Sequence, residues 1–167
     1  MSKKMQILTN EEINQKTRRI AYQIVEDNSD AGELIFIGIK PNGFQYAEQL
    51  KKEVESIDGT KVTLLELQLD KTNPLQNPIE LRNGKLSLNN KSVIVVDDVA
   101  NTGKTLYYAL KPVMEFSPKK VQAAVLVDRQ HKMFPVTPDF VGLSLSTTLK
   151  EHIRVEFKSG KGKAYLM

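Results

Sequence analysis

The feature that most constrains the fold is a run of four β-branched residues that ends in two carboxylates. Residues 93–96 read Val-Ile-Val-Val, which indicates a central strand of a parallel sheet covered on both faces. Asp97 and Asp98 come next, and small residues then lead into a helix expected at about 103–116. Open α/β sheets bind ligands at the carboxyl ends of their strands, and helix N-termini favour anions. The segment therefore predicts a site for a ligand with hydroxyl groups near a phosphate.

Other interpretations fit the same residues. Two acids after a buried strand are often a solvated strand end or a helix N-cap, and such a strand also suits a metal-binding nucleotidase. Gly103-Lys104-Thr105 suggests an ATP-binding loop, but that motif needs a glycine where the chain has Asp98. The ATP-binding loop is therefore set aside, while the other interpretations stay open.

Apolar periodicity places further elements around this strand. Thr9 and Glu12 form a capping-box pattern, which predicts a helix at about 10–28. A second helical repeat is predicted at 44–54, and additional strands are predicted at 34–39, 62–69, 121–128, 140–143 and 152–157. Because strands alternate with helices, we expect an α/β fold with a mainly parallel sheet flanked by helices, in one domain spanning residues 1–167.

Residues 70–90 interrupt this alternation. They contain two prolines, a glycine and several asparagines, which predicts an excursion from the sheet in the form of a lid or short hairpin. Near the other end of the chain, Lys158, Lys161 and Lys163 are expected to form a solvated basic tail.

Composition restricts the chemistry and the location. The 167 residues include no cysteine, which excludes disulfides and thiolate metal sites, and two histidines are too few to suggest a metal cage. The net charge of +4 suits polyanionic small molecules and permits RNA binding. No apolar stretch is long enough to span a bilayer, and no apolar segment of a signal peptide follows the basic N-terminal residues. We therefore expect a cytoplasmic protein with no membrane partner.

Several motifs together resemble a known family. The strand, Asp97-Asp98 and Thr102-Gly103-Lys104-Thr105 are similar to the phosphoribosyl pyrophosphate (PRPP) signature of the type I phosphoribosyltransferases. Residues 37–43 resemble the pyrophosphate loop of that family. Residues 124–132 and 139–142 are similar to one branch, the pyrimidine operon attenuator/uracil phosphoribosyltransferases. The resemblance spans about residues 9–157, and it implies the type I fold with a small hood and lid.

The resemblance also implies an activity and a set of contacts. The reaction would transfer the phosphoribosyl group of PRPP to a nucleobase, with uracil as the first acceptor to consider, and would release pyrophosphate. Asp97 and Asp98 would be the catalytic pair and accept hydrogen bonds from the ribose 2′ and 3′ hydroxyls. The other contacts implied are, for the 5′-phosphate, Ala100, Asn101, Thr102, Gly103, Lys104 and Thr105; for pyrophosphate, Lys40, Pro41, Asn42 and Gly43; and for the base side, Asp128 and Arg129.

Some of these assignments have a second interpretation. Lys104 could equally point to solvent, Lys40 to Gly43 could form an ordinary Pro-x-Gly turn, and Arg129 could form a surface salt bridge. Mg²⁺ is expected to be held mainly by PRPP and water, because it keeps much of its hydration shell, so no protein metal cage is expected. Family habit implies a homo-oligomer, most simply a dimer.

The chain departs from the branch at places that bear on function. The branch has a Thr-Leu-Tyr-Arg-Asp-Asp run in its lid, whereas residues 67–74 here lack the Tyr, the Arg and one acid, and Lys71 could partly replace the cation. Asn42 stands where an Arg is usual. Thr137, Leu143 and Tyr22 stand where the branch offers basic residues or a histidine, which disfavours RNA binding.

Three functions remain open at this stage. The first is phosphoribosyl transfer to uracil. The second is a PRPP- or nucleotide-sensing, RNA-binding regulator of pyrimidine genes with little or no turnover. The third is phosphoribosyl transfer to a purine base.

Overall fold

The computed structural model describes residues 3–167, which form nine strands and three helices. In chain order the elements are β1 (Met5–Leu8), α1 (Asn10–Asp27), β2 (Glu33–Ile39), α2 (Asn42–Asp58), β3 (Lys61–Gln68), β4 (Glu80–Arg82), β5 (Ser92–Ala100), α3 (Lys104–Val113), β6 (Lys120–Arg129), β7 (Phe140–Leu145), β8 (Ile153–Lys158) and β9 (Lys161–Leu166). Within the described residues, no helix combines the length and apolar character needed to cross a bilayer.

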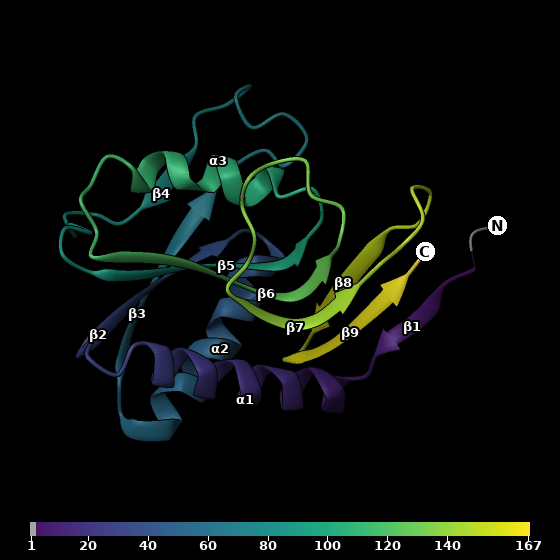
Figure 1. Ribbon diagram of the computed structural model, residues 1–167, viewed down its shortest axis with the longest axis horizontal. Helices are drawn as coiled ribbons and strands as arrows, with labels where there is room; N and C mark the ends of the chain where they lie inside the picture. The colour runs from purple at the N-terminus through teal and green to yellow at the C-terminus, as the bar shows by residue number, and fades with distance from the viewer. Residues whose placement is uncertain (1–2) are drawn as a thin grey trace.

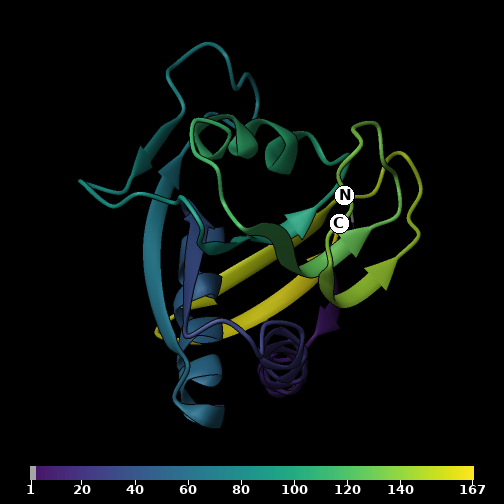
Figure 2. The same ribbon diagram turned by 60° about the vertical axis from the view of Figure 1, so that its left-hand side comes forward.

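The larger sheet has the strand order β4-β3-β2-β5-β6-β7 (Figure 1). All neighbouring strands in it are parallel except β4, which pairs antiparallel with β3. Helices α1 and α2 lie on one face of this sheet and α3 lies on the other (Figures 1 and 2). This arrangement confirms the predicted α/β fold with a mainly parallel, helix-flanked sheet.

The central strand β5 is longer than the sequence pattern predicted. Its pairing with β2 ends at Val96, but its pairing with β6 continues to Ala100. Asp97 and Asp98 therefore lie inside β5 rather than after it, because β6 continues to supply backbone partners on one side. On the other side they lie beyond the end of β2, where the sheet opens.

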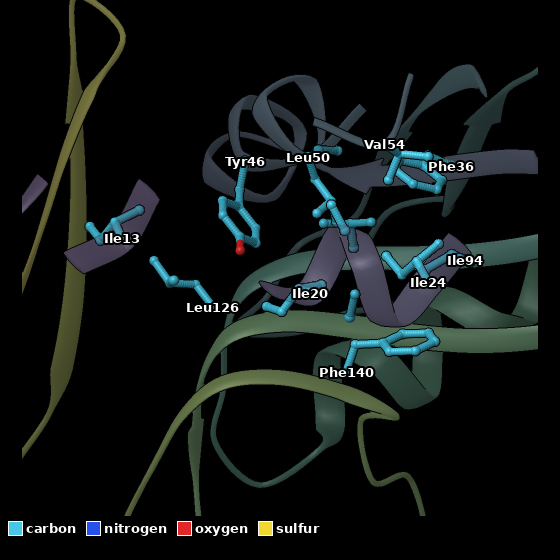
Figure 3. Packing of buried hydrophobic residues seen from close by; sticks show 14 of the residues in the cluster. Ile13, Ile20, Ile24, Phe36, Tyr46, Leu50, Val54, Ile94, Leu126 and Phe140 are labelled. Atoms are coloured by element: carbon cyan, nitrogen blue, oxygen red, sulfur yellow. The ribbon is translucent and has the colours of Figure 1, made fainter. Parts of the chain in front are cut away.

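Two apolar clusters fill the two sides of the sheet. Phe36 and Ile94 point toward α1 and α2, where they pack with side chains such as Ile24 and Leu50 (Figure 3). The alternate residues of the same strands, among them Ile35 and Val93, point toward α3. This alternation covers β2 and β5 on both faces and explains why their sequences are continuously apolar.

Helix α1 follows its sequence pattern closely. The Thr9 hydroxyl accepts a hydrogen bond from the Glu12 backbone N–H at 3.2 Å, and the Glu12 carboxylate accepts one from the Thr9 N–H at 2.9 Å. The predicted capping box is thus confirmed. The apolar face of the helix, including Ile13 and Ile20, is completely buried.

A second, antiparallel sheet of three strands, in the order β1-β9-β8, lies beside the main one. We call it the hood sheet. Its inner residues, including Val155 and Ala164, belong to the same apolar cluster as Ile94. Lys158, Lys161 and Lys163 are exposed, as predicted, but the last two belong to strand β9 and not to a tail without regular structure. Neither β1 nor β9 was predicted.

The predicted excursion at 70–90 is only partly an excursion. Residues 80–82 return to the edge of the main sheet as β4, and Leu88 is completely buried against the α3 side. The segment 70–79 stands apart from the sheet and approaches the end of β5 through the contacts described below.

Candidate active site

A cavity of about 610 Å³ lies between the end of β5 and the hood sheet. Its lining brings together segments that are distant in sequence: Asn42 from α2, Lys71, residues 98–106 and strand β8. All six residues predicted to hold a 5′-phosphate, 100–105, line this cavity together with Asp98.

Two buried carboxylates lie at the cavity end of β5, and of the two Asp98 lines the cavity. Asp97 is 1% exposed and Asp98 is 7% exposed, so neither is a solvated strand end. Neither caps α3, because the N-cap position is Gly103 and the side chain bonded to the Lys104 N–H is that of Thr102, at 3.3 Å. The carboxylate of Asp97 instead accepts the backbone N–H of Asp98 at 2.9 Å.

The acids are held by two polar side chains. The Nζ atom of Lys71 lies 3.0 Å from Oδ1 of Asp97 and 3.7 Å from Oδ1 of Asp98. Nδ2 of Asn42 donates to Oδ2 of Asp98 at 3.1 Å and to the backbone carbonyl of Val155 at 2.9 Å. Asn42 therefore joins the acids to the free edge of the hood sheet.

Burial and charge perturb this group of residues. Burial, reinforced by the charge of Asp98, raises the pKa of Asp97 well above its usual value, although Lys71 opposes the shift. Burial alone would lower the pKa of Lys71, but the two carboxylates outweigh it and raise that pKa. Strongly perturbed groups in a cleft are typical of functional sites.

The loop between β5 and α3 is shaped for close approach of an anion. Gly103 has a φ of +86°, a conformation that favours glycine. The first turn of α3, which includes Lys104 and Thr105, lines the cavity, and the Thr102 hydroxyl accepts the Lys104 N–H at 3.3 Å. The carbonyl of Thr102 accepts the N–H groups of Met133 and Phe134 at 2.9 and 3.0 Å, which fixes the loop from outside. A helix N-terminus open to a cavity is a common anion site.

Lys104 lines the cavity, and its role at the phosphate stays a prediction. Its ammonium group donates to the backbone carbonyl of Thr72 at 3.2 Å, so it connects α3 to the segment 70–79. The sequence offered no signal for this contact, because the two residues belong to separate elements.

The predicted pyrophosphate loop is shorter than expected. The Lys40–Pro41 peptide bond is cis, and α2 begins at Asn42, so Asn42 and Gly43 are helical. The Lys40 ammonium pairs with Glu66, and among these four residues only Asn42 lines the cavity. Pro41 ends the loop because it takes the N-cap position of α2.

Gly43 has a clear packing role. A Cβ atom placed on it would lie 2.8 Å from Oδ1 of Asp97 and 2.8 Å from the carbonyl of Val96. The missing side chain therefore allows the start of α2 to contact the end of β5.

We expect Gly43→Ala to lower the free energy of unfolding by about 2 kcal/mol, since overpacking against backbone commonly costs this much. The melting temperature should fall by roughly 4–8 °C. Alanine favours helices over glycine, so a loss of stability would show that the close approach dominates. Gly32→Ala is the matched control, because its Cβ would meet nothing within 4 Å. Equal thermal stability of the two variants would contradict this packing role.

Asp128 and Arg129 lie at the end of β6 but do not line the cavity. Asp128 forms an ion pair with Lys132. The Arg129 guanidinium donates to the Thr147 hydroxyl and, at 2.7 Å, to the carbonyl of Thr148. Their role on the base side stays a prediction.

Sequence reasoning missed strand β8 as a wall of the cavity. Arg154, Glu156, Phe157 and Lys158 all line it. Period-two alternation was the only available signal, and it predicts a strand without saying which partner strand positions it.

The chain matches the phosphoribosyl transferase domain family model over residues 4–159. It is 37% identical over 153 residues to the bifunctional protein PyrR of Limosilactobacillus fermentum, covering 85% of this chain and 86% of that protein. It is 34% identical over 165 residues to the bifunctional protein PyrR of a Synechocystis species, covering 95% and 93% of the two chains.

Solved structures agree at the level of the fold. A hypoxanthine-guanine phosphoribosyltransferase of Bacillus anthracis superposes with a TM-score of 0.73 at 21% identity, covering 89% of this chain and 86% of that one. The hypoxanthine phosphoribosyltransferase of Trypanosoma cruzi gives a TM-score of 0.73 at 19% identity, covering 84% and 81%. Sequence and fold thus lead to one conclusion: the chain belongs to the phosphoribosyl transferase domain family and is a phosphoribosyltransferase similar to the PyrR proteins.

Proposed function

We propose that the chain transfers the phosphoribosyl group of PRPP to a nucleobase, with uracil the first acceptor to test, and releases pyrophosphate. The observation that carries this proposal is that Asp98, next to the buried Asp97, lines one cavity together with the first turn of α3, whose N-cap residue is Gly103. Carboxylates only accept hydrogen bonds, so they suit a diol, and the helix N-terminus suits a phosphate. A ribose phosphate carries both a diol and a phosphate.

In this proposal the chain binds and orients more than it reacts. As the bond between the anomeric carbon and pyrophosphate loosens, positive charge develops on the ribose ring, and the adjacent carboxylates of Asp97 and Asp98 stabilise it. The backbone N–H groups of residues 100–105, with the hydroxyls of Thr102 and Thr105, would hold the 5′-phosphate. Asn42 is the residue of the Lys40–Gly43 segment placed to meet the pyrophosphate side.

The carboxylate of Asp98, which lines the cavity, fits Mg²⁺ that arrives with PRPP. Mg²⁺ prefers oxygen ligands and keeps several waters. A carboxylate such as that of Asp98 could bind the ion directly or accept hydrogen bonds from its waters. When bound, the ion would neutralise part of the pyrophosphate charge.

We keep Asp128 and Arg129 as the proposed base side for a topological reason. Asp128 pairs in register with Ala100. Strand β6 therefore brings Asp128 and Arg129 to the same edge of the sheet as Asp97 and Asp98. A homodimer and a cytoplasmic location also remain proposals, supported by family habit and composition.

The decisive experiment measures pyrophosphate release from PRPP with a panel of uracil, cytosine, adenine, guanine and hypoxanthine. We expect uracil to give the highest kcat/KM. A higher value with hypoxanthine or guanine would favour the purine-base alternative. If no base releases pyrophosphate while PRPP still raises the melting temperature, the enzyme proposal fails and a PRPP sensor remains.

The regulator alternative gains support from the charged side chains that strands β8 and β9 present on one face of the hood sheet. Cross-strand register places Lys158 opposite Lys161 and Glu156 opposite Lys163, with Arg154 one pair further along. Lys4 also pairs with Glu156 at 3.2 Å, so this face has five cations around one carboxylate, at a place distinct from the positions where the branch usually binds RNA. A basic sheet face suits a single-stranded polyanion.

Binding of single-stranded RNA across a salt series tests this second candidate. Neutralising Lys161 and Lys163 should reduce the slope of log K against log salt by about 0.7 for each lost phosphate contact. Neutralising Lys119, which pairs with Asp30 on the surface, is the control. Equal slopes for all variants would contradict RNA binding at this face.

A further inference from the structure

Lys71 occupies the position over the acids that the ribose is proposed to take. Its ammonium group lies 3.0 and 3.3 Å from the two carboxylate oxygens of Asp97. The side chain is 36% exposed, whereas that of Asp97 is 1% exposed, so the lysine approaches from the cavity side. The ammonium group and a ribose diol would therefore use the same acceptor atoms.

The turn that carries Lys71 is held in place. The carboxylate of Asp70 accepts the backbone N–H groups of Thr72 at 2.9 Å and Asn73 at 3.0 Å. Lys104, from the first turn of α3, binds the Thr72 carbonyl. The Asp70 side chain and the Lys104 ammonium group thus both hold the turn that carries Lys71.

The acids need this cation when no ligand is present. Among residues 3–167, no other ion pair reaches Asp97 or Asp98. Asn42 contributes only a neutral amide. Two adjacent buried carboxylates without a counter-ion would repel each other, and an uncompensated buried charge is strongly unfavourable.

We propose that Lys71 is a counter-ion that PRPP displaces from the acids and that then pairs with the pyrophosphate group. This inference rests on the proposed function, because it requires the ribose hydroxyls to bind Asp97 and Asp98. The exchange breaks no covalent bond, and the amine keeps its proton throughout. The pyrophosphate is the natural new partner, since Asn42 of the proposed pyrophosphate segment contacts Asp98 and lines the same cavity as Lys71.

The exchange makes opposite predictions for two ligands. Ribose 5-phosphate has the hydroxyls and the phosphate but no pyrophosphate, so it must displace Lys71 without offering it a new partner. PRPP offers that partner. Lys71→Met removes the ammonium group, so it should strengthen binding of ribose 5-phosphate about threefold and weaken binding of PRPP with Mg²⁺ about tenfold. The selectivity of the protein for PRPP over ribose 5-phosphate should therefore fall about thirtyfold.

Isothermal titration calorimetry of both ligands on the full chain measures this selectivity. Lys71→Arg keeps the charge and should retain most of the preference for PRPP. Lys119→Met removes a surface lysine that pairs with Asp30 and should change neither affinity. With a base that supports turnover, Lys71→Met should also lower kcat, because the leaving pyrophosphate loses a cation.

The outcomes separate the two proposals. If the wild-type chain binds PRPP but Lys71→Met weakens both ligands by the same factor, or neither, the counter-ion inference is wrong and the proposed function stands. If the wild-type chain binds neither sugar phosphate, both are wrong. Melting temperatures of all variants establish that each one is folded.

Discussion

Replacing both Asp97 and Asp98 with asparagine is expected to weaken PRPP binding by at least about a hundredfold. Each ribose hydroxyl would lose a charge-assisted hydrogen bond, and such bonds contribute about 1.5–3 kcal/mol each. Asparagine can still accept the backbone N–H that Asp97 now accepts at 2.9 Å, so the end of β5 should keep its conformation. Titration calorimetry with PRPP and Mg²⁺ provides the measurement.

A double variant at exposed acids serves as the control for this experiment. Asp30 and Asp58 lie on the surface, where they contact Lys119 and Thr60, so Asp30→Asn with Asp58→Asn removes the same total charge. PRPP affinity should be close to that of the wild type in this control. Unchanged affinity in the Asp97 and Asp98 variant would refute the assignment of the ribose hydroxyls to these acids.

The second large effect concerns pH and stability. Burial, with the neighbouring charge of Asp98, raises the pKa of Asp97 in the folded chain, so the folded state holds this proton more tightly than the unfolded state. Stability therefore falls as the pH rises from the ordinary value of 3.8 through the raised pKa. Asp97→Asn removes this titration. We expect its free energy of unfolding, relative to wild type, to increase with pH across that interval and to level off above it.

Urea unfolding at a series of pH values measures the difference between the two chains. Asp58→Asn is an informative control because hydrogen bonds from Thr60 lower the pKa of Asp58 in the folded state. The stabilisation by Asp58 is present above 3.8 and is lost as the pH falls through the lowered pKa, so the control should show a dependence of opposite sign. A pH-independent difference for Asp97→Asn would contradict the raised pKa.

Local patterns predicted most of the main sheet. The capping box at Thr9 and the apolar run at 93–96 each depend on residues close in sequence, and both elements formed where expected. The length of β5 was not predictable, because Asp97 to Ala100 become strand residues only through pairing with β6.

The sequence predicted one side of the candidate site and not the other. Residues 98–105 line the cavity together, whereas Asp97, which the resemblance pairs with Asp98, does not line it. The contacts made by Lys71 and Lys104 were not predictable, since each joins segments whose separation is set by tertiary packing. The other wall, strand β8, is positioned by β9 and by the Asn42 side chain, and neither interaction leaves a sequence signature.

The hood sheet has a consequence for the order of folding. The Lys4–Glu156 ion pair and the bond from the Gly162 N–H to Asn10 each connect positions 152 residues apart. Closing so long a loop is slow, and such contacts form late during folding and synthesis. The central strands can pair on the ribosome before β9 has been made. A nascent chain would therefore carry the acids and the α3 N-terminus before it has the second wall of its cavity.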